Sequence, residues 1–205
     1  MSKQSAAHWN SVYASKAPDA VSWYSPHLET SLQLIKRVAP RYPVIIDVGG
    51  GESTLVDDLL AEGYRYLTVL DISEEAINAC KKRFGAVADY VSWRVDDITK
   101  ADLPHNFYDV WHDRAVFHFL TREEDRRAYV ERVAYSMKPG GHVIVATFGP
   151  QGPTQCSGLD VMRYDADALH AEFGRRFRLL KTRMEVHRTP WGSDQQFVYC
   201  LCRID

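Results

Sequence analysis

The strongest candidate for a functional site in this sequence is a turn rich in glycine. Asp47 ends the apolar run of residues 44–46, glycines fill positions 49–51, and apolar residues then recur at helical spacing from Leu55. A strand, a glycine turn and a helix in this order bring backbone N–H groups and the positive end of the helix against a ligand. A Cβ atom would block that close approach, so the glycines mark a candidate ligand site.

A second acid, Asp71, ends the next apolar run, residues 66–70. It follows Gly51 by 20 positions (71 − 51). An acid at the end of the second strand, at about this spacing, accepts hydrogen bonds from ribose hydroxyls in nucleotide-binding βαβ units. The turn, the spacing and the acid together predict a ligand that contains adenosine.

The glycine spacing separates two kinds of adenosine ligand. A dinucleotide site has the pattern G-x-G-x-x-G, whereas the third position after Gly51 is Thr54. A carboxylate at Glu52 would also repel a pyrophosphate. The pattern here is D-x-G-x-G, at Asp47, Gly49 and Gly51, which resembles the first motif of the class I S-adenosylmethionine-dependent methyltransferases. In that family the turn faces the amino-acid part of the cofactor, so the resemblance implies S-adenosyl-L-methionine at this site.

The end of the third expected strand, residues 90–95, resembles the adenine-binding motif of the same family. The order of acid, apolar residue and threonine assigns the adenine amino group to Asp97, with Ile98 packing on the ring. Ile72, directly after the ribose acid, is placed in the same cofactor site. Asp96 is the competing choice for adenine, and either acid could instead cap the turn that follows.

The exit of the fourth expected strand is where the family places residues that face the methyl acceptor. Asp113 could accept a proton from an amine acceptor or orient it, and His118 could act as a base because its reference pKa lies near neutrality. These two residues are the candidate catalytic groups. Arg114 could instead pair with Asp113 and remove it from the chemistry. His112 is interpreted as a strand-end residue whose hydrogen bonds are satisfied.

Aromatic residues of the N-terminal segment, residues 1–27, are expected near the cofactor. They either hold this segment on the surface as an arm or close over the cofactor as a lid that excludes water, with Trp23 and Tyr24 at the hinge. The pattern of Trp9, Tyr13 and residues 22–24 also resembles small methyltransferases that modify lysines of translation proteins. That subgroup has a D-K-G-type sequence where this chain has Asp-Arg-Ala at residues 113–115, which disfavours a lysine acceptor.

Two later segments are expected to border the acceptor. Cys156 lies in a glycine- and proline-rich loop, residues 149–158, that follows the fifth strand on the ligand side. His187 and Trp191 lie in a turn between the last two strands. Long loops at such places are often functional. An ordinary connecting loop and a plain hairpin tip are the alternative interpretations.

These residues require a sheet that brings several strand ends together. The resemblance implies an α/β fold: a Rossmann-like, doubly wound, seven-stranded sheet of order 3-2-1-4-5-7-6 with one antiparallel strand. The methyltransferase domain is expected to span residues 28–205, behind the arm of residues 1–27. Ser73 is a predicted N-cap, and Thr121 with Glu124 a predicted capping box. Residues 138–141 are expected to form the turn before strand five.

Composition narrows the class of protein further. The chain has 205 residues, 45% of them hydrophobic and 25% charged, with a formal net charge of −2. We therefore expect one globular domain with no basic field for nucleic acid. No apolar run approaches the roughly 20 residues of a membrane span, and no signal peptide is visible. Four cysteines without paired spacing fit a reducing, cytoplasmic location, and no metal-ligand spacing is present. The oligomeric state is undetermined.

The sequence thus predicts a methyltransferase that moves a sulfonium methyl group to an N, O or S acceptor of unknown identity, on a small molecule or a protein side chain. Because the methyl group is already activated, the protein mainly supplies proximity, orientation and exclusion of water. Two alternatives are a non-catalytic module that keeps the cofactor fold and, on weaker grounds, an NAD-dependent oxidoreductase.

Overall fold

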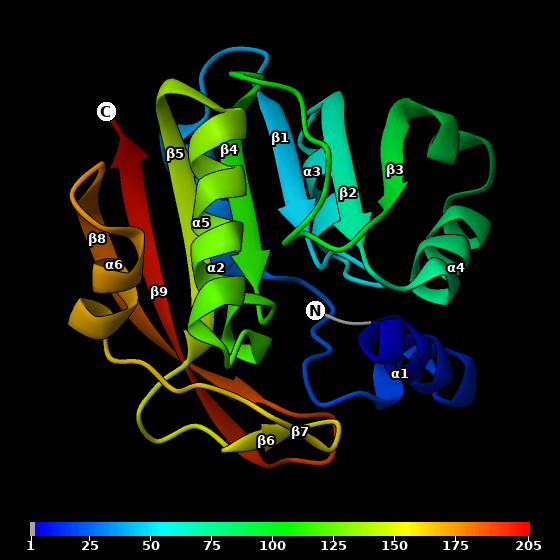
Figure 1. Ribbon diagram of the computed structural model, residues 1–205. Coiled ribbons are helices and arrows are strands. Elements are labelled where there is room, and N and C mark those ends of the chain that lie inside the picture. Colours follow the sequence, from blue (N-terminus) through cyan, green and yellow to red (C-terminus); the bar gives the residue numbers. More distant parts are fainter. Residues whose placement is uncertain (1–2) are drawn as a thin grey trace.

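The fold is built on one mixed sheet, seen in a computed structural model that describes residues 3–205 (Figure 1). Seven strands pair in the order β3-β2-β1-β4-β5-β9-β8. The strands are β1 (Val44–Val48), β2 (Tyr66–Asp71), β3 (Val91–Val95), β4 (Tyr108–Arg114), β5 (Met137–Phe148), β8 (Phe177–Arg188) and β9 (Asp194–Ile204). Numbered within this sheet alone, the order is 3-2-1-4-5-7-6, and β9 runs antiparallel to both neighbours. The predicted sheet order and its single antiparallel strand are confirmed.

Helices cover both faces of the sheet. Two of them, α5 (Glu123–Ser136) and α6 (Ala166–Phe173), pack on one face, where Val48 and Trp111 point. On the other face lie α2 (Glu29–Val38), α3 (Leu55–Ala61) and α4 (Glu74–Phe84), against Ile45 and Val110. Successive residues of a strand point to opposite faces, so neighbours along one strand serve different layers.

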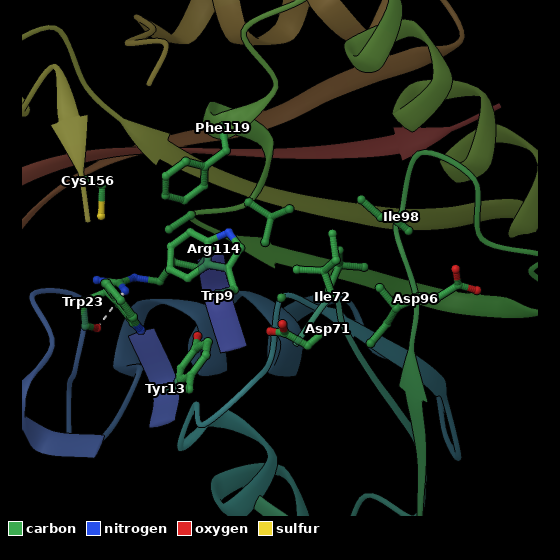
Figure 2. A pocket seen from close by; sticks show the side chains of 15 residues that line it. Trp9, Tyr13, Trp23, Asp71, Ile72, Asp96, Ile98, Arg114, Phe119 and Cys156 are labelled. Carbon is green, nitrogen blue, oxygen red and sulfur yellow. Dashed lines mark hydrogen bonds between the residues drawn. The ribbon is translucent and has the colours of Figure 1, made fainter. Parts of the chain in front are cut away.

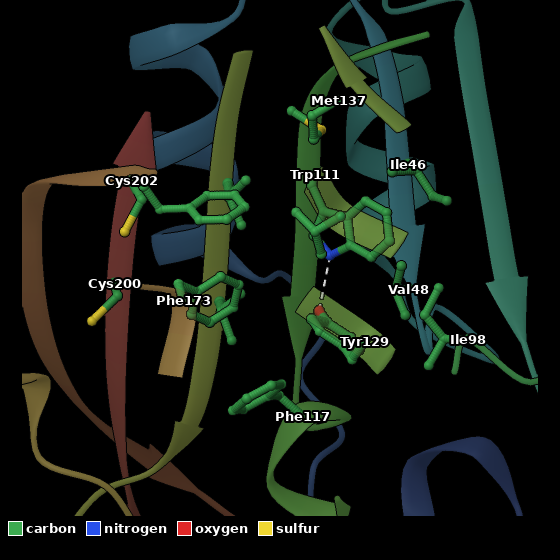
Figure 3. Close-up of a cluster of buried hydrophobic side chains, with 14 of the residues drawn as sticks. Ile46, Val48, Ile98, Trp111, Phe117, Tyr129, Met137, Phe173, Cys200 and Cys202 are labelled. Atoms are coloured by element: carbon green, nitrogen blue, oxygen red, sulfur yellow. Dashed lines mark hydrogen bonds between the residues drawn. The ribbon is translucent and has the colours of Figure 1, made fainter. Parts of the chain in front are cut away.

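The register between β1 and β4 decides which polar residues become neighbours. Asp47 pairs with His112, and Val48 pairs with Asp113. Asp47 and His112 therefore share the α2 face, while Asp113 points into the core beneath α5. In that core Trp111 donates a hydrogen bond of 2.9 Å from its indole nitrogen to the Tyr129 hydroxyl (Figure 3). A buried indole needs such a partner, and the bond fixes Tyr129 beside Asp113.

Smaller elements connect this framework. The amino-terminal helix α1 (Lys3–Ser15) lies beside α4, as Figure 1 shows. The remaining elements are the 3₁₀ turns η1 (Pro18–Ala20), η2 (Gly85–Tyr90) and η3 (Phe117–Phe119), and a hairpin of β6 (Gln155–Cys156) and β7 (Leu159–Asp160). Within the described residues, no helix has both the length and the apolar character needed to cross a membrane.

Two local predictions differ from the structure, and one is confirmed. Ser73 is the N-cap of α4 and accepts a hydrogen bond from Ala76 N–H. The predicted capping box is wrong because α5 begins at Glu123 after Arg122, which makes no side-chain cap. Residues 138–141 are not a separate turn, since β5 begins at Met137 and absorbs them where its register with β4 shifts.

Candidate functional site

Two adjoining pockets open where the parallel strands end. The first holds about 620 Å³ of empty space and the second about 510 Å³, part of it open to solvent, and these sizes suit a small-molecule ligand. Figure 2 shows the first pocket, with Asp71, Ile72, Asp96 and Ile98 toward one end and Trp23, Phe119 and Cys156 toward the other. The second lies against the glycine turn. Both pockets share Tyr13, Trp23, Gly49 and Arg114 as lining residues, so one extended ligand can reach from one pocket to the other.

The glycine turn fits tightly between two strand ends. Gly49 has φ of +69°, and a Cβ atom there would lie 1.9 Å from Val116 Cγ2. Its N–H donates a 2.7 Å hydrogen bond to the Leu70 carbonyl. A Cβ atom on Gly51 would lie 2.8 Å from Asp71 Oδ2. No side chain fits at Gly49 without moving the exit of β4, so the turn stays close to the pocket.

The ribose candidate, Asp71, lies in the first pocket with only 5% of its surface exposed. Its Oδ1 accepts a 2.8 Å hydrogen bond from Ser73 N–H. Burial raises the pKa of Asp71 to about 7, against the opposing effect of that hydrogen bond. The carboxyl group can accept hydrogen bonds from a ligand diol, which is the role expected from its spacing.

At the adenine end, the structure separates the two adjacent acids. Ile72, Asp96 and Ile98 line the first pocket, whereas Asp97 does not. Asp97 Oδ1 instead accepts hydrogen bonds from the N–H and hydroxyl of Thr99, at 3.0 and 2.7 Å. Asp97 thus caps the turn and Asp96 lies on the pocket wall, and the assignment of Asp97 to adenine stays a prediction.

The second pocket holds three buried side-chain atoms without a hydrogen-bond partner among the described residues, Glu52 Oε2 and two of opposite charge on Asp47 and Arg114. Asp47 uses Oδ1 to bind His112 Nδ1 at 2.7 Å, and its Oδ2 has no partner among the described residues. Arg114 donates from Nε to the Tyr199 hydroxyl and from Nη1 to the Trp23 carbonyl, each at 3.2 Å. Its Nη2 has no hydrogen bond within residues 3–205 and lies 3.6 Å from Glu185 Oε1. Buried groups of this kind are normally satisfied, so the pocket is built for a polar ligand.

The position of Asp113 does not support its predicted role at the methyl acceptor. Asp113 is fully buried and lines neither pocket. Its carboxylate accepts hydrogen bonds from Val116 N–H at 2.9 Å, Phe117 N–H at 3.1 Å and the Tyr129 hydroxyl at 2.6 Å. Burial raises the pKa of Asp113 to about 6, opposed by the bond from Tyr129. The expected pairing with Arg114 is also replaced, because Arg114 lies near Glu185.

His118 is likewise placed away from the pockets. It is fully buried, and its Nδ1 accepts a 3.2 Å hydrogen bond from Phe148 N–H. Its ring lies between Phe119 and Phe148, with centroids 4.6 and 4.5 Å away. Burial, together with the nearby Arg114 charge, lowers the pKa of His118 to about 3. The ring is neutral at physiological pH and lines neither pocket, so the base role is corrected to a packing role.

The other expected site residues divide between the pockets and the surface. Cys156 lines the first pocket and Tyr24 the second, while Trp23 lines both. Burial raises the pKa of the Cys156 thiol. His187 lines neither pocket and donates to the Ser22 carbonyl at 2.8 Å, and Trp191 is 62% exposed outside both. Their placement at the acceptor is not supported, because neither residue lines a pocket.

An aromatic wall lines the first pocket, and it adds Phe119 to the aromatic residues of the N-terminal segment that the sequence placed near the cofactor. Trp9 on α1 packs edge-on against Trp23 and Phe119, with centroids 5.7 and 5.1 Å apart. Tyr13, one turn further along α1, packs on Trp23 at 6.2 Å. Burial and the Asp71 charge hold the pKa of Tyr13 well above its usual value. The i, i+4 spacing of Trp9 and Tyr13 was the available signal, since it places both rings on one helical face.

Comparison with known proteins then identifies the domain. The methyltransferase domain family matches residues 46–143, just under half of the chain, a segment that carries the glycine turn, Asp71 and the first residues of β5. Residues 46–143 are thus similar to that family. The predicted class I methyltransferase resemblance is confirmed, and S-adenosylmethionine is accordingly the cofactor to be considered at the two pockets.

The curated relatives that this chain matches are much longer than the chain itself. The mouse (Mus musculus) eEF1A lysine and N-terminal methyltransferase is 28% identical over 121 residues, which cover 59% of this chain and 17% of the mouse protein. The chain thus spans about a sixth of the length of the curated relatives it matches.

Solved structures share the fold. A protein studied in the conversion of a disulfide bond into a thioacetal group during echinomycin biosynthesis has a TM-score of 0.80 at 18% identity, covering 98% of this chain and 93% of its own. The N-methyltransferase NodS of Bradyrhizobium japonicum WM9, in complex with S-adenosylhomocysteine, has a TM-score of 0.71 at 15% identity, covering 95% and 97%.

Proposed function

We propose that this chain is a methyltransferase that binds S-adenosylmethionine across the two pockets. The observation that carries the proposal is a pair of buried atoms of opposite charge without a hydrogen bond, Asp47 Oδ2 and Arg114 Nη2, beside the glycine turn. The amino-acid tail of this cofactor ends in an ammonium and a carboxylate, which complement those two charges. A nicotinamide dinucleotide offers a pyrophosphate at this place, and Glu52 in the same pocket opposes it.

The residues divide the work of binding and orientation. Asp71 accepts hydrogen bonds from the ribose, Ile72 and Ile98 pack on the adenine, and Asp96 lies at its edge. The cofactor, when bound, supplies a sulfonium methyl group already activated for displacement. The strand ends hold its reactive part still, and the aromatic wall of Trp9, Trp23 and Phe119 keeps water away. Proximity and exclusion of water are sufficient contributions for such a transfer.

The far end of the first pocket indicates what kind of acceptor can react. Among the described residues that line this end, Tyr13 and Cys156 are held neutral by their raised pKa values, and Arg114 is a cation. None of them can take a proton from an ammonium group. We therefore propose a small acceptor whose reactive atom has a free lone pair at neutral pH, such as a thiolate or a weakly basic nitrogen. A lysine side chain, named for the mouse relative, is disfavoured here.

The amino-terminal segment is proposed to cover the bound cofactor. Asn10 Oδ1 on α1 accepts a 2.7 Å hydrogen bond from the Ser73 hydroxyl, so the arm is joined to the N-cap of α4. Trp9 and Tyr13 extend from this helix into the first pocket. This supports the division into an arm, residues 1–27, and a methyltransferase domain, residues 28–205. A cytoplasmic location is also proposed, on four cysteines that are buried and unpaired.

Calorimetric titration tests the cofactor assignment. The wild-type protein should bind S-adenosylhomocysteine with micromolar affinity and should not bind NADH. Release of S-adenosylhomocysteine from S-adenosylmethionine should then be measured with three probes: thiophenol, n-butylamine and a lysine-containing peptide. Turnover with thiophenol alone supports the acceptor proposal, and turnover with the peptide alone contradicts it. Tight NADH binding would overturn the methyltransferase assignment itself.

A further inference from the structure

A continuous chain of buried hydrogen bonds joins the two charged residues of the second pocket. Asp47 binds His112 Nδ1 at 2.7 Å, and His112 Nε2 binds the Ser31 hydroxyl at 2.8 Å. Ser31 lies 3.4 Å from the Tyr199 hydroxyl, which accepts from Arg114 Nε at 3.2 Å. All five residues are buried. The chain draws on β1, β4, α2 and β9, so distant parts of the sequence converge on one pocket.

The first three members have the connectivity of a hydrolase triad, with a serine, a histidine and an aspartate in series. A nucleophile, however, must reach its substrate. Ser31 is fully buried and lines neither pocket. The arrangement therefore cannot act by nucleophilic attack, and orientation is the role that its geometry allows.

The hydrogen-bond pattern at Asp47 shows how orientation works. An ionised carboxylate only accepts hydrogen bonds, so His112 Nδ1 carries the proton and donates it to Oδ1. Ser31 fixes the other side of the ring and so keeps the imidazole in that plane. Oδ1 is thereby occupied, and Oδ2 is left as the acceptor available to a ligand. At the other end, Tyr199 holds Arg114 Nε while Nη2 stays without a hydrogen bond.

We propose that His112 and Ser31 are positioning residues that hold Asp47 for the ammonium group of the cofactor, with Tyr199 holding Arg114 for its carboxylate. This inference rests on the proposed cofactor assignment. Its consequence is selective: the chain of hydrogen bonds acts on the amino-acid tail and leaves the adenosine end alone. The affinity for a ligand that lacks the tail should not depend on this chain of hydrogen bonds.

Two ligands that differ only in that tail provide the test. S-adenosylhomocysteine carries the ammonium and carboxylate, whereas 5′-methylthioadenosine keeps the adenosine and the sulfur but has neither charged group. Calorimetry on His112→Leu should show S-adenosylhomocysteine binding weakened by about tenfold or more, because a charged hydrogen-bonded group loses its support. Binding of 5′-methylthioadenosine should stay within about twofold of wild type.

His112→Asn is the matched rescue variant, because the asparagine amide nitrogen lies near the place of Nδ1 and can still donate to Asp47. It should retain more S-adenosylhomocysteine affinity than His112→Leu, and Ser31→Ala should fall between wild type and His112→Leu. Thermal unfolding of each variant separates loss of folding from loss of binding. If His112→Leu fails to fold, the comparison of His112→Asn and Ser31→Ala with wild type carries the test.

The outcomes distinguish this inference from the proposed function. Equal weakening of both ligands in the variants would assign His112 and Ser31 a structural role and overturn the inference. Unchanged binding of both ligands would overturn it as well. Wild-type protein that binds 5′-methylthioadenosine as tightly as S-adenosylhomocysteine would show that no tail is recognised. Wild-type protein that binds neither would remove the cofactor assignment itself.

Discussion

Asp71 and Asp113 are both buried carboxyl groups at the carboxyl ends of parallel strands, yet they face different surroundings. Asp71 lies in a pocket, where Ser73 N–H donates to its Oδ1 and backbone hydrogen bonds from Gly51 and Ile72 also support the carboxylate. Asp113 receives two backbone N–H groups and the Tyr129 hydroxyl and faces no pocket. Burial raises both pKa values, to about 7 and about 6. The first group lies on a pocket wall, where a ligand can reach it, whereas the second is enclosed by the fold.

The difference follows from strand parity. Asp113 pairs across the sheet with Val48, which points into the core beneath α5, and so does Asp113. One position earlier, His112 pairs with Asp47 and faces α2. An acid at a strand end is therefore a ligand group or a structural group according to the face that its register assigns.

The largest expected effect separates the two acids by stability. Asp113→Ala should lower the free energy of unfolding by about 4 kcal/mol, because two buried N–H groups and a hydroxyl lose their acceptor. Urea unfolding followed by tryptophan fluorescence measures this change. Asp71→Ala is the control and should cost much less. Equal losses for the two variants would contradict the division of roles.

The second prediction concerns ligand affinity. Asp71→Ala should weaken S-adenosylhomocysteine binding by about 100-fold, since two charge-assisted hydrogen bonds to the ribose are removed. Calorimetric titration gives this ratio directly. A loss below about threefold would mean that the ribose lies elsewhere.

Removal of one partner of Asp113 should have an intermediate effect. Tyr129→Phe leaves Trp111 Nε1 without an acceptor and takes one donor from Asp113. The free energy of unfolding should fall by about 2 kcal/mol. Affinity for S-adenosylhomocysteine should not change, because Tyr129 lies in the core below the pockets; a large change in affinity would connect Asp113 to the ligand after all.

The smallest effect is a pH dependence that Asp71 alone should confer on binding. Its pKa is raised to about 7, and ligand hydroxyls favour the ionised form. Affinity should therefore be highest well above pH 7 and should decline as the pH falls. It should be roughly eightfold weaker at about pH 6 than at about pH 7.5. Asp71→Asn should abolish this slope in the same titrations.

The same group also affects the stability of the free protein, and this stability depends on pH in the opposite direction from binding. The folded state holds the Asp71 proton more tightly than the unfolded chain, in which the pKa returns to its usual range. This contribution to stability is therefore complete at acid pH and is lost as the pH rises through about 7. If the free energy of unfolding of the free protein increased as the pH rose through about 7, relative to Asp71→Asn, that result would contradict the raised pKa.

The sequence was sufficient for the parts of the molecule that depend on local order. The glycine turn and the spacing to Asp71 carried the resemblance to the methyltransferase family, and that resemblance implied the sheet order, which the structure confirms. The sequence alone could not predict the role of a residue when that role depends on the register between two strands. Asp113 was expected at the acceptor and His112 was set aside, although one residue of register exchanges their faces.

The aromatic wall and the role of Arg114 depend on contacts across long sequence separations. Trp9 meets Phe119, and Arg114 meets Tyr199 and Trp23. Such contacts arise when the arm and β9 close on the strand ends, and no pattern within a single segment encodes them. The predicted place of Trp191 at the acceptor is unsupported for the same reason, since the pairing of β8 with β9 sets the direction of the hairpin that carries it.

The position of α1 has a practical consequence for handling the protein. This helix lies on the side of the sheet where β1, β2 and β4 end, whereas the last residues of the chain lie at the other end of the sheet (Figure 1). A purification tag joined ahead of α1 would stand near the ligand entrance, and one joined after Asp205 would stand far from it. We expect the first kind of fusion to change the rate of ligand exchange and the second to leave it unaltered.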